Sequence, residues 1–190
     1  MPIDIEIIKA CLQNDRAAQK QLYEMFASRL YAIALRYMKD KESAEDVLQE
    51  SFVKIFRHLD TFRFDSPLDA WLRKIVVNTA LKALKKNSGL ALSLEGEYMI
   101  DENLQSYHTV MERLSHQELI DLIGELPEGC RTVFNLYAIE GYKHHEIAKI
   151  LGVTEGTSKS QYSRAKSLLQ EKLAAEERRL KEIKKNERQV

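Results

Sequence analysis

The sequence has little of what builds loop-rich or cross-linked proteins. Its 190 residues include only 7 Gly, 3 Pro and 2 Cys. Long stretches of helix-forming residues, with so few glycines and prolines to interrupt them, predict an all-α fold. Cys11 and Cys130 stand far apart, and no Cys or His lies beside either at metal-ligand spacing, so no metal site is expected. A disulfide between them stays open, but buried free thiols in a reducing cytosol fit the sequence better.

Long apolar runs are also missing. No run approaches membrane-spanning length, and the N-terminal residues Met-Pro-Ile-Asp-Ile-Glu-Ile-Ile lack the basic start of a secretion signal. We therefore expect no membrane insertion and a cytoplasmic location. Hydrophobic residues make up 44% of the chain and charged residues 31%, which allows a packed core and argues against wholesale disorder.

The chain has no net charge, because 29 Lys and Arg balance 29 Asp and Glu, and this excludes a uniformly basic nucleic-acid binder. The charge is nevertheless uneven. Residues 61–88 carry six basic against two acidic side chains, residues 93–125 one against eight, and residues 159–190 ten against five. Two basic blocks separated by an acidic one suggest two DNA-facing surfaces and a connector that avoids DNA. Ordinary solvated helix faces remain the alternative, above all for the last block.

Helical periodicity and boundary signals divide the chain into four parts. Residues 1–88 are predicted to form a helical domain, residues 89–114 a flexible acidic linker, residues 115–173 a second helical domain and residues 174–190 a charged tail. In the first domain, helices are predicted over residues 3–38 with a break at Asn14-Asp15, over residues 43–59 and over residues 68–86. Ser43 with Asp46 is predicted as a capping box. The expected core includes Leu22, Met25, Phe26, Leu30, Val47, Leu48, Phe52, Ile55, Phe56 and Leu72.

Further helices are predicted over residues 104–114, 115–126, 127–141, 143–151 and 154–173. Ser115 with Glu118 is a second capping box, and Pro127 suits the first position of a helix. Gly152 suits the residue after a helix, and Thr154 suits the N-cap of the next one.

The last two predicted helices form a helix-turn-helix, residues 143–151 and 154–173. The second helix carries hydroxyl, amide and basic side chains, which are the groups that contact phosphates and base edges in the DNA major groove. DNA binding is therefore the leading hypothesis. A helical pair with a polar solvent face is the alternative, but it leaves the basic helix after the Gly-Val-Thr turn unexplained. The candidate DNA-binding residues are Thr157, Lys159, Ser160, Gln161, Ser163 and Arg164.

Two further groups of residues suggest binding surfaces in the first domain. Asp46, Gln49 and Glu50 fall on neighbouring helical turns, and this acidic and amide face could meet a basic helical partner; a solvated helix side is the default alternative. Residues 62–86 interleave aromatic and cationic side chains, a pattern that suits single-stranded DNA, where bases stack on rings. The alternative there is that Phe62 and Trp71 belong to the core.

Taken together, the two halves resemble the bacterial sigma factors of the extracytoplasmic-function (ECF) group, in a form familiar among Bacteroidetes. The resemblance covers roughly residues 17–173. Its motifs are Asp46-Val-Leu-Gln-Glu-Ser-Phe52, Phe62-Arg-Phe-Asp-Ser66, Trp71-Leu-Arg-Lys-Ile-Val-Val-Asn-Thr-Ala80 and the run from Pro127 to Lys166. The resemblance implies two helical domains, σ2 and σ4, joined by a linker without a σ3 domain. It implies a non-catalytic subunit that directs promoter-specific initiation, with neither a cofactor nor a small-molecule substrate.

The resemblance also implies partners and site residues. The acidic helix would bind the β′ clamp helices of core RNA polymerase through Asp46, Gln49, Glu50 and Phe52. The −10 element would be recognised and melted by Phe62, Arg63, Phe64, Asp65, Ser66, Asn78 and Lys82, which hold a flipped base. The −35 element would be contacted by the six helix-turn-helix residues named above. The σ4 domain would pack on the β flap, and an anti-sigma factor is a further expected partner.

The chain departs from the family pattern at three positions. Phe64 stands where a glycine is common, and Ser158 and Gln161 replace a usual aliphatic residue and a usual arginine. The −35 preference of better-studied relatives is therefore not transferable. Other classes of protein explain the sequence less well. A stand-alone helix-turn-helix regulator leaves residues 62–86 without a role, and a pure protein-interaction module does not need the basic helix. No nucleophile–base pair or phosphate loop suggests an enzyme.

Overall fold

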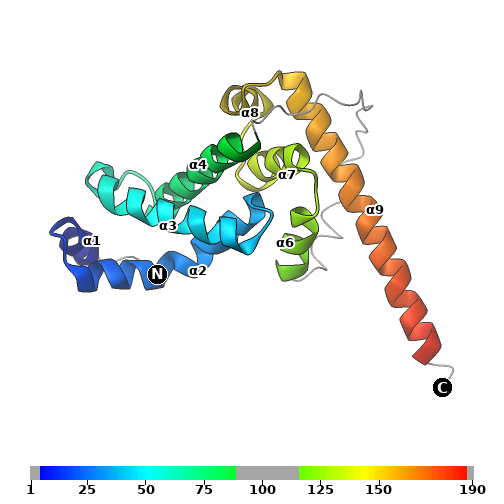
Figure 1. Ribbon diagram of the computed structural model, residues 1–190, viewed down its shortest axis with the longest axis horizontal. Coiled ribbons are helices and arrows are strands. Elements are labelled where there is room, and N and C mark those ends of the chain that lie inside the picture. Colours follow the sequence, from blue (N-terminus) through cyan, green and yellow to red (C-terminus); the bar gives the residue numbers. More distant parts are fainter. Residues whose placement is uncertain (1–4, 89–115, 188–190) are drawn as a thin grey trace. The chain divides into compact units, whose positions relative to one another are not determined.

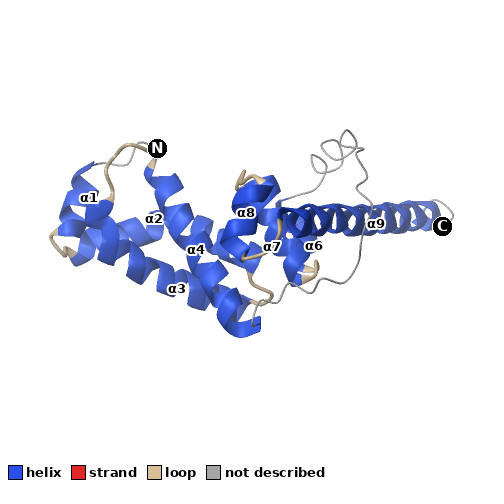
Figure 2. Ribbon diagram, turned by 90° about the horizontal axis from the view of Figure 1, so that it is seen from above, coloured by secondary structure: helices blue, strands red, loops and turns tan. Residues whose placement is uncertain are grey.

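The computed structural model describes residues 5–88 and 116–187, and the regular elements in these ranges are helical (Figures 1 and 2). The chain divides into two compact units, Met1–Ala91 and Leu92–Val190. The predicted linker, the short helix expected over 104–114 and the capping residue Ser115 lie outside the described residues. The helix predicted to follow Ser115 is described from His116. No helix in the described parts is both long enough and apolar enough to span a membrane.

The first unit consists of α1 Ile5–Leu12, α2 Arg16–Tyr37, α3 Lys41–His58, the short 3-10 helix η1 Leu59–Thr61 and α4 Leu68–Ser88. The predicted break between the first two helices is confirmed. Asn14 adopts a left-handed backbone with φ of 60°, which asparagine tolerates. Asp15 then caps α2 by accepting hydrogen bonds from the backbone N–H groups of Ala17 and Ala18.

The predicted start of α3 at Ser43 is wrong. The helix begins at Lys41, and its N-cap is Asp40, whose carboxylate accepts a hydrogen bond from the Ser43 backbone N–H at 2.8 Å. The Ser43 hydroxyl donates to the same carboxylate at 2.9 Å. Asp40 is the cap because a carboxylate at the helix N-terminus satisfies free N–H groups and is favoured by the helix dipole. The hydrogen bond from Ser43 lowers the pKa of Asp40.

The core of the first unit forms where α2, α3 and α4 pack against one another, with α1 against α2 (Figure 1). Its side chains include Leu22, Phe26, Leu30, Val47, Leu48, Ile55, Leu72 and Val76, all buried. Met25, predicted to be in the core, is 40% exposed. The neighbouring Phe26 takes the inward position, and two consecutive helical residues rarely point the same way.

The second unit consists of α6 His116–Gly124, α7 Glu128–Phe134, the π-helical turn η3 Asn135–Ile139, α8 His144–Leu151 and α9 Glu155–Glu187. Pro127 was predicted to be the first helical residue of α7, but it is the N-cap, and the helix begins at Glu128. Gly141 and Gly152 have φ of 79° and 73°, conformations that favour glycine, and they follow the π turn and α8 as expected. Thr154 accepts a hydrogen bond from the Thr157 backbone N–H at 3.0 Å, so its predicted capping role is confirmed.

The second core joins α6, α7 and α9. Its buried residues are Ile123, Leu126, Cys130, Phe134, Ala165 and Leu169, and Tyr162 packs at its edge. Arg131 is buried as well, and its guanidinium donates to the carbonyl oxygens of Gly124 and Leu126 at 3.1 and 3.0 Å. Gly124 is the last residue of α6 and Leu126 lies in the turn before Pro127, so the helix supplies no donor to either carbonyl. Arg131 therefore fixes the corner between α6 and α7.

Candidate functional site

An acidic and amide surface lies on one side of α3. Asp46, Gln49 and Glu50 are exposed there, as their spacing predicts. Val53, which the sequence reasoning missed, shares this side and is 55% exposed. Phe52 does not share it: the side chain is 5% exposed, and its ring centroid lies 4.6 Å from that of Tyr23 on α2. No spacing signature in the sequence marks Val53 as an exposed apolar residue.

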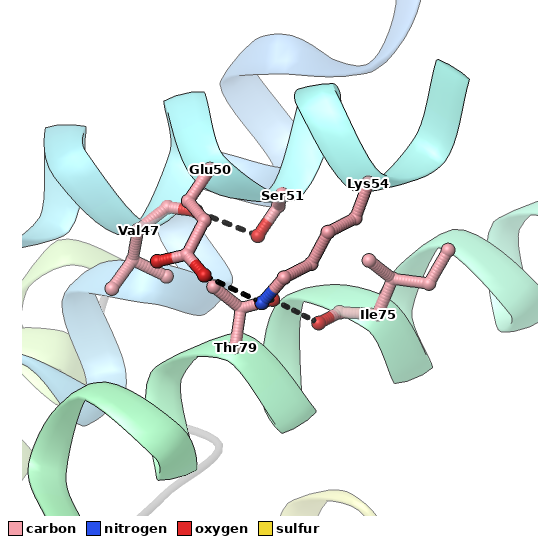
Figure 3. A network of polar contacts seen from close by, with 6 residues as sticks. All are labelled: Val47, Glu50, Ser51, Lys54, Ile75 and Thr79. Carbon is pink, nitrogen blue, oxygen red and sulfur yellow. Dashed lines mark hydrogen bonds and ion pairs between the residues drawn. The ribbon is translucent and has the colours of Figure 1, made fainter. Parts of the chain in front are cut away.

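The position of Glu50 is fixed by a polar chain between α3 and α4 (Figure 3). The Lys54 ammonium lies 2.7 Å from the Glu50 carboxylate and donates to the Thr79 hydroxyl at 3.0 Å. The Thr79 hydroxyl in turn donates to the Ile75 carbonyl at 2.8 Å. Thr79 is buried, whereas Glu50 is exposed, so this series of polar contacts runs from the core to the surface. It links the acidic side of α3 to α4, the helix with the candidate DNA-binding residues.

The electrostatics of Glu50 follow from this chain. The hydrogen bond from Lys54 lowers the pKa of the Glu50 carboxyl, and the charges of Lys54, Lys82 and Lys86 act in the same direction. Glu50 is therefore ionised at neutral pH. The same contacts show that the acidic side of α3 borders the cations of α4.

The loop after η1, residues 62–67 (the aromatic loop), carries two phenylalanine rings, and one of them packs against Trp71 of α4. Phe62 is 7% exposed, and its ring centroid lies 5.6 Å from that of Trp71 and 4.8 Å from that of Phe64. Phe64 is 52% exposed and has φ of 59°, the left-handed conformation that favours glycine. Of the predicted −10 residues, Phe62 is therefore in the core, as the alternative held, whereas the loop residues Arg63, Phe64, Asp65 and Ser66 are exposed.

The exposed side of α4 is basic. Asn78 and Lys82, both predicted to contact DNA, are exposed at an i, i+4 spacing, and Lys74 lies one turn before them. Lys85 and Lys86 extend the series toward the end of the helix. Near its start, Asp69 pairs with Arg29 of α2 at 2.6 Å and with Arg73 at 3.9 Å. The structure therefore brings four lysines and one asparagine together on one basic helix, next to an exposed aromatic loop.

The predicted recognition residues on α9 fall into two groups. Lys159 is exposed, and Ser160 and Arg164 are half-exposed. The other three, Thr157, Gln161 and Ser163, are buried. The Gln161 side-chain oxygen accepts a hydrogen bond from the Cys130 thiol at 3.0 Å, and the Thr157 hydroxyl pairs with that of Thr154 at 2.9 Å. The Thr157 hydroxyl and the Gln161 side-chain oxygen are thus used within the fold.

His144 is half-buried and joins the two helices of the helix-turn-helix. Its Nδ1 lies 2.9 Å from the hydroxyl of Ser158 on α9, and its ring stacks on Tyr137 with centroids 4.2 Å apart. Burial lowers the pKa of His144, the Lys159 charge lowers it further, and Glu155 acts in the opposite direction. The imidazole is therefore neutral at pH 7. Ser158, one of the three departures from the family pattern, is thus the hydrogen-bond partner of His144.

Among the described residues, no three His, Cys, Asp or Glu side chains are grouped as a metal site would require. Cys11 and Cys130 are both buried and free. Burial raises the pKa of the Cys130 thiol, although the charge of Arg164 opposes that shift. Cys130 is therefore a protonated hydrogen-bond donor to Gln161 at neutral pH.

Comparison with known protein families gives two matches in chain order. The family profile Sigma-70 region 2 matches residues 22–89, and the profile Sigma-70, region 4 matches residues 116–169. These spans contain α3, the aromatic loop and α4 in the first match, and the helix-turn-helix in the second.

Curated relatives match over nearly the whole chain. The ECF RNA polymerase sigma-E factor of Haemophilus influenzae is 28% identical over 90% of this chain and 95% of its own length. The ECF RNA polymerase sigma factor SigM of Mycobacterium tuberculosis is 29% identical, with 87% and 82% covered. Among solved structures, the sigma factor RpoE of Bartonella quintana in complex with the anti-sigma factor NepR is 26% identical, with 82% and 96% covered and a TM-score of 0.49.

Proposed function

This chain belongs to the ECF group of the sigma-70 family, and we propose from that premise how its two helical units share the work of a sigma factor. It binds core RNA polymerase and directs promoter-specific transcription initiation, and it has no catalytic chemistry of its own. The observation that carries this conclusion is the match of regions 2 and 4, in order, within one chain. A stand-alone helix-turn-helix regulator needs only the second match, so the first match argues against it.

The acidic surface of α3 is proposed to bind the β′ clamp helices of core polymerase. Asp46, Gln49 and Glu50 supply charge and hydrogen-bond acceptors, and the exposed Val53 supplies apolar contact area. A pairing of acidic and apolar side chains suits a basic amphipathic helix. Phe52 supports this surface from the core, where it packs on Tyr23.

The aromatic loop and α4 are proposed to recognise and help melt the −10 element. The exposed loop residues and Asn78 would contact bases, and Lys82 would contact the backbone phosphates. Phe62 acts indirectly, because it is buried between Trp71 and Phe64 and holds the loop in place. Melting then needs no nucleotide hydrolysis, since capture of unstacked bases favours the open form at about 1–3 kcal/mol per stacked base.

The start of α9 is proposed to read the −35 element. Lys159, Ser160 and Arg164 are the residues available to phosphates and base edges. Thr157, Gln161 and Ser163 are proposed to shape this surface from beneath. The unit would also dock on the β flap. We further propose, from the Gly-Thr-Ser-Lys-Ser-Gln run of residues 156–161, that the chain is similar to the Bacteroidetes members of the group.

The remaining assignments follow from the family. Residues 1–88 are proposed as σ2, 89–114 as a linker, 115–173 as σ4 and 174–190 as a charged tail. The site of action is the cytoplasm. A regulatory partner of the anti-sigma class is proposed, in keeping with the complex of RpoE and NepR in a relative.

Run-off transcription tests the proposed function. Purified core polymerase from a related bacterium would be assayed with and without this chain on a library of candidate promoters. We expect specific initiation only with the chain present, and the selected sequences would define its −10 and −35 preferences. DNA binding without any initiation, or without binding to core polymerase, would instead identify a stand-alone regulator.

A further inference from the structure

A buried cysteine of α7 is hydrogen-bonded to the candidate recognition helix. Cys130 is fully buried, and its thiol donates to the side-chain oxygen of Gln161 on α9 at 3.0 Å. Burial raises the pKa of this thiol more than the charge of Arg164 lowers it, so the sulfur keeps its proton at neutral pH. A protonated thiol donates, and of the two ends of a glutamine amide only the oxygen accepts. The contact therefore fixes which end of the Gln161 amide faces the core.

Gln161 lies where α9 passes from the core to the candidate DNA-binding surface. Ala165 and Leu169, one and two turns later on the same side of the helix, pack in the same core as Cys130. Arg164, three positions after Gln161, is half-exposed. Gln161 itself is 9% exposed, and its amide nitrogen is not one of the described side-chain atoms that are buried without a hydrogen-bond partner. With the oxygen held inward, the nitrogen is the end of the amide that is left for the surface.

The orientation of this amide decides what the side chain can read in DNA. A glutamine with both ends free pairs with adenine, because its oxygen accepts from N6 and its nitrogen donates to N7. Gln161 cannot make this pair while Cys130 holds its oxygen toward the core. What remains is a donor, which suits the major-groove acceptors of guanine, thymine and adenine alike and finds none on cytosine. An arginine at this position would also be a donor without an acceptor, so Cys130 lets a neutral side chain keep that character.

We propose that Cys130 is a positioning residue for promoter recognition, whose thiol makes Gln161 a donor-only contact to the −35 element. This inference rests on the proposed function of α9 and deepens it, because it adds a residue of another helix that sets which bases are accepted. Cys130 does not touch DNA and acts through the orientation of one amide. At the base that faces Gln161, the wild type should therefore accept guanine, thymine and adenine alike and should reject cytosine.

The test compares the base preferences of Cys130 variants of the full chain, assembled with core polymerase. The probes are fluorescent promoter duplexes that carry the −35 sequence selected by the wild type, with each of its base pairs changed in turn to the other three. Cys130→Ala removes the donor and frees the oxygen, so we expect a new preference for adenine at one position, about five- to 150-fold over the other bases. Cys130→Ser retains a donor and should keep the wild-type profile. Affinity for core polymerase without DNA should not change in either variant.

Replacing Gln161 shows whether the effect passes through its amide. In the double variant, Gln161→Ala should abolish the adenine preference of Cys130→Ala, because no amide is left to reorient. In the wild-type background, Gln161→Ala should weaken binding about equally to the guanine, thymine and adenine probes at that position, and least to the cytosine probe. This second comparison leaves the thiol in place, so it still decides the question if thermal melting shows that Cys130→Ala does not fold.

Three results would overturn the proposal. The first is a wild-type profile in folded Cys130→Ala, and the second is a Cys130→Ser profile that shifts as far as that of Cys130→Ala. The third is a Gln161→Ala variant that loses affinity for the adenine probe alone, or for no probe at all. The proposed function fails separately, if the wild type does not bind core polymerase. The same duplexes would then be titrated with the chain alone, and Cys130 is judged by whether Cys130→Ala changes the chain's own base preference.

Discussion

Single side chains in this protein act mainly by positioning others. Glu50 is exposed, yet its carboxylate has a defined place because Lys54 bridges it to the buried Thr79. An exposed ion pair of this kind contributes little to stability, about 0–1 kcal/mol. Its value at the residue scale is geometric: it presents one charge of the proposed polymerase-binding surface in a fixed orientation.

Replacing Lys54 should therefore affect binding more than folding. Lys54→Met keeps the apolar stem and removes the charge. We expect core-polymerase affinity to fall several-fold while the free energy of unfolding changes by less than about 1 kcal/mol. Thr79→Val, which removes only the hydroxyl, should act in the same direction and more weakly. Titration of labelled protein with core polymerase measures both, and unchanged affinity for Lys54→Met would remove this polar chain from the account.

At the scale of elements, helix ends are stabilised by side chains distant in sequence or missed by simple motifs. Arg131 of α7 donates to the carbonyl oxygens of Gly124, the last residue of α6, and of Leu126 in the turn that follows. His144 at the start of α8 pairs with Ser158 of α9. Burial lowers the pKa values of both side chains. The consequences differ, because arginine stays charged while histidine becomes neutral.

Loss of Arg131 should destabilise the second unit selectively. Arg131→Ala leaves the carbonyls of Gly124 and Leu126 without this donor. If both carbonyls stay dry, each should cost about 1–3 kcal/mol; if water reaches them, the total loss should be about 1–3 kcal/mol. Trp71, the single tryptophan, lies in the first unit, so its fluorescence follows that unit, while circular dichroism follows all helices. Urea unfolding should show a shift by circular dichroism and none by fluorescence. Arg131→Lys should recover only part of the loss, because an ammonium lacks the planar fork. No shift by either signal would contradict the role assigned to Arg131.

His144 should make the second unit sensitive to mild acid. Its folded-state pKa lies below the ordinary value of 6.5, so below that pH the unfolded chain binds a proton that the folded chain does not. Stability should be complete above about pH 7 and should fall as the pH drops through 6.5. Thermal melts at pH 7.5 and 5.5 would measure this, with His144→Asn expected to reduce the difference. His145→Asn, at the exposed neighbouring position, is the control and should leave the difference intact.

At the scale of the whole molecule, periodicity and spacing predicted the helices but not every inward-facing side. Patterns of apolar residues found α2, α3, α4, α8 and α9, because burial of an amphipathic face determines those helices. The all-α fold and the two-domain sigma architecture are confirmed. The start of α3 was misplaced because Asp40 and Ser43 are both good caps, and only the structure shows which one is used.

The site was predicted less completely, for a related reason. A polar residue on a helix can face solvent or pair within the core, and sequence alone does not distinguish the two. Gln161 pairs with Cys130, thirty-one positions earlier in the chain, and no local pattern signals that contact. The family motif placed Phe52 and Phe62 among the contact residues, although both are buried. For Phe52, the helical spacing correctly predicted a core position. Val53 was missed because an exposed apolar residue has no spacing signature.

The most direct test of the account measures two affinities for the same two variants. Glu50→Lys reverses a charge on the proposed polymerase-binding surface, and Arg164→Ala removes a proposed −35 contact. The control is Glu24→Lys, which breaks a comparable exposed ion pair between Lys20 and Glu24 on α2. For each variant, binding to core polymerase without DNA and binding of the assembled holoenzyme to promoter DNA would be measured. We predict that Glu50→Lys lowers core affinity at least about 100-fold. Arg164→Ala should leave core affinity unchanged and weaken promoter binding about five- to 150-fold. Wild-type core affinity for Glu50→Lys, or wild-type promoter binding for Arg164→Ala, would contradict the division of labour proposed here.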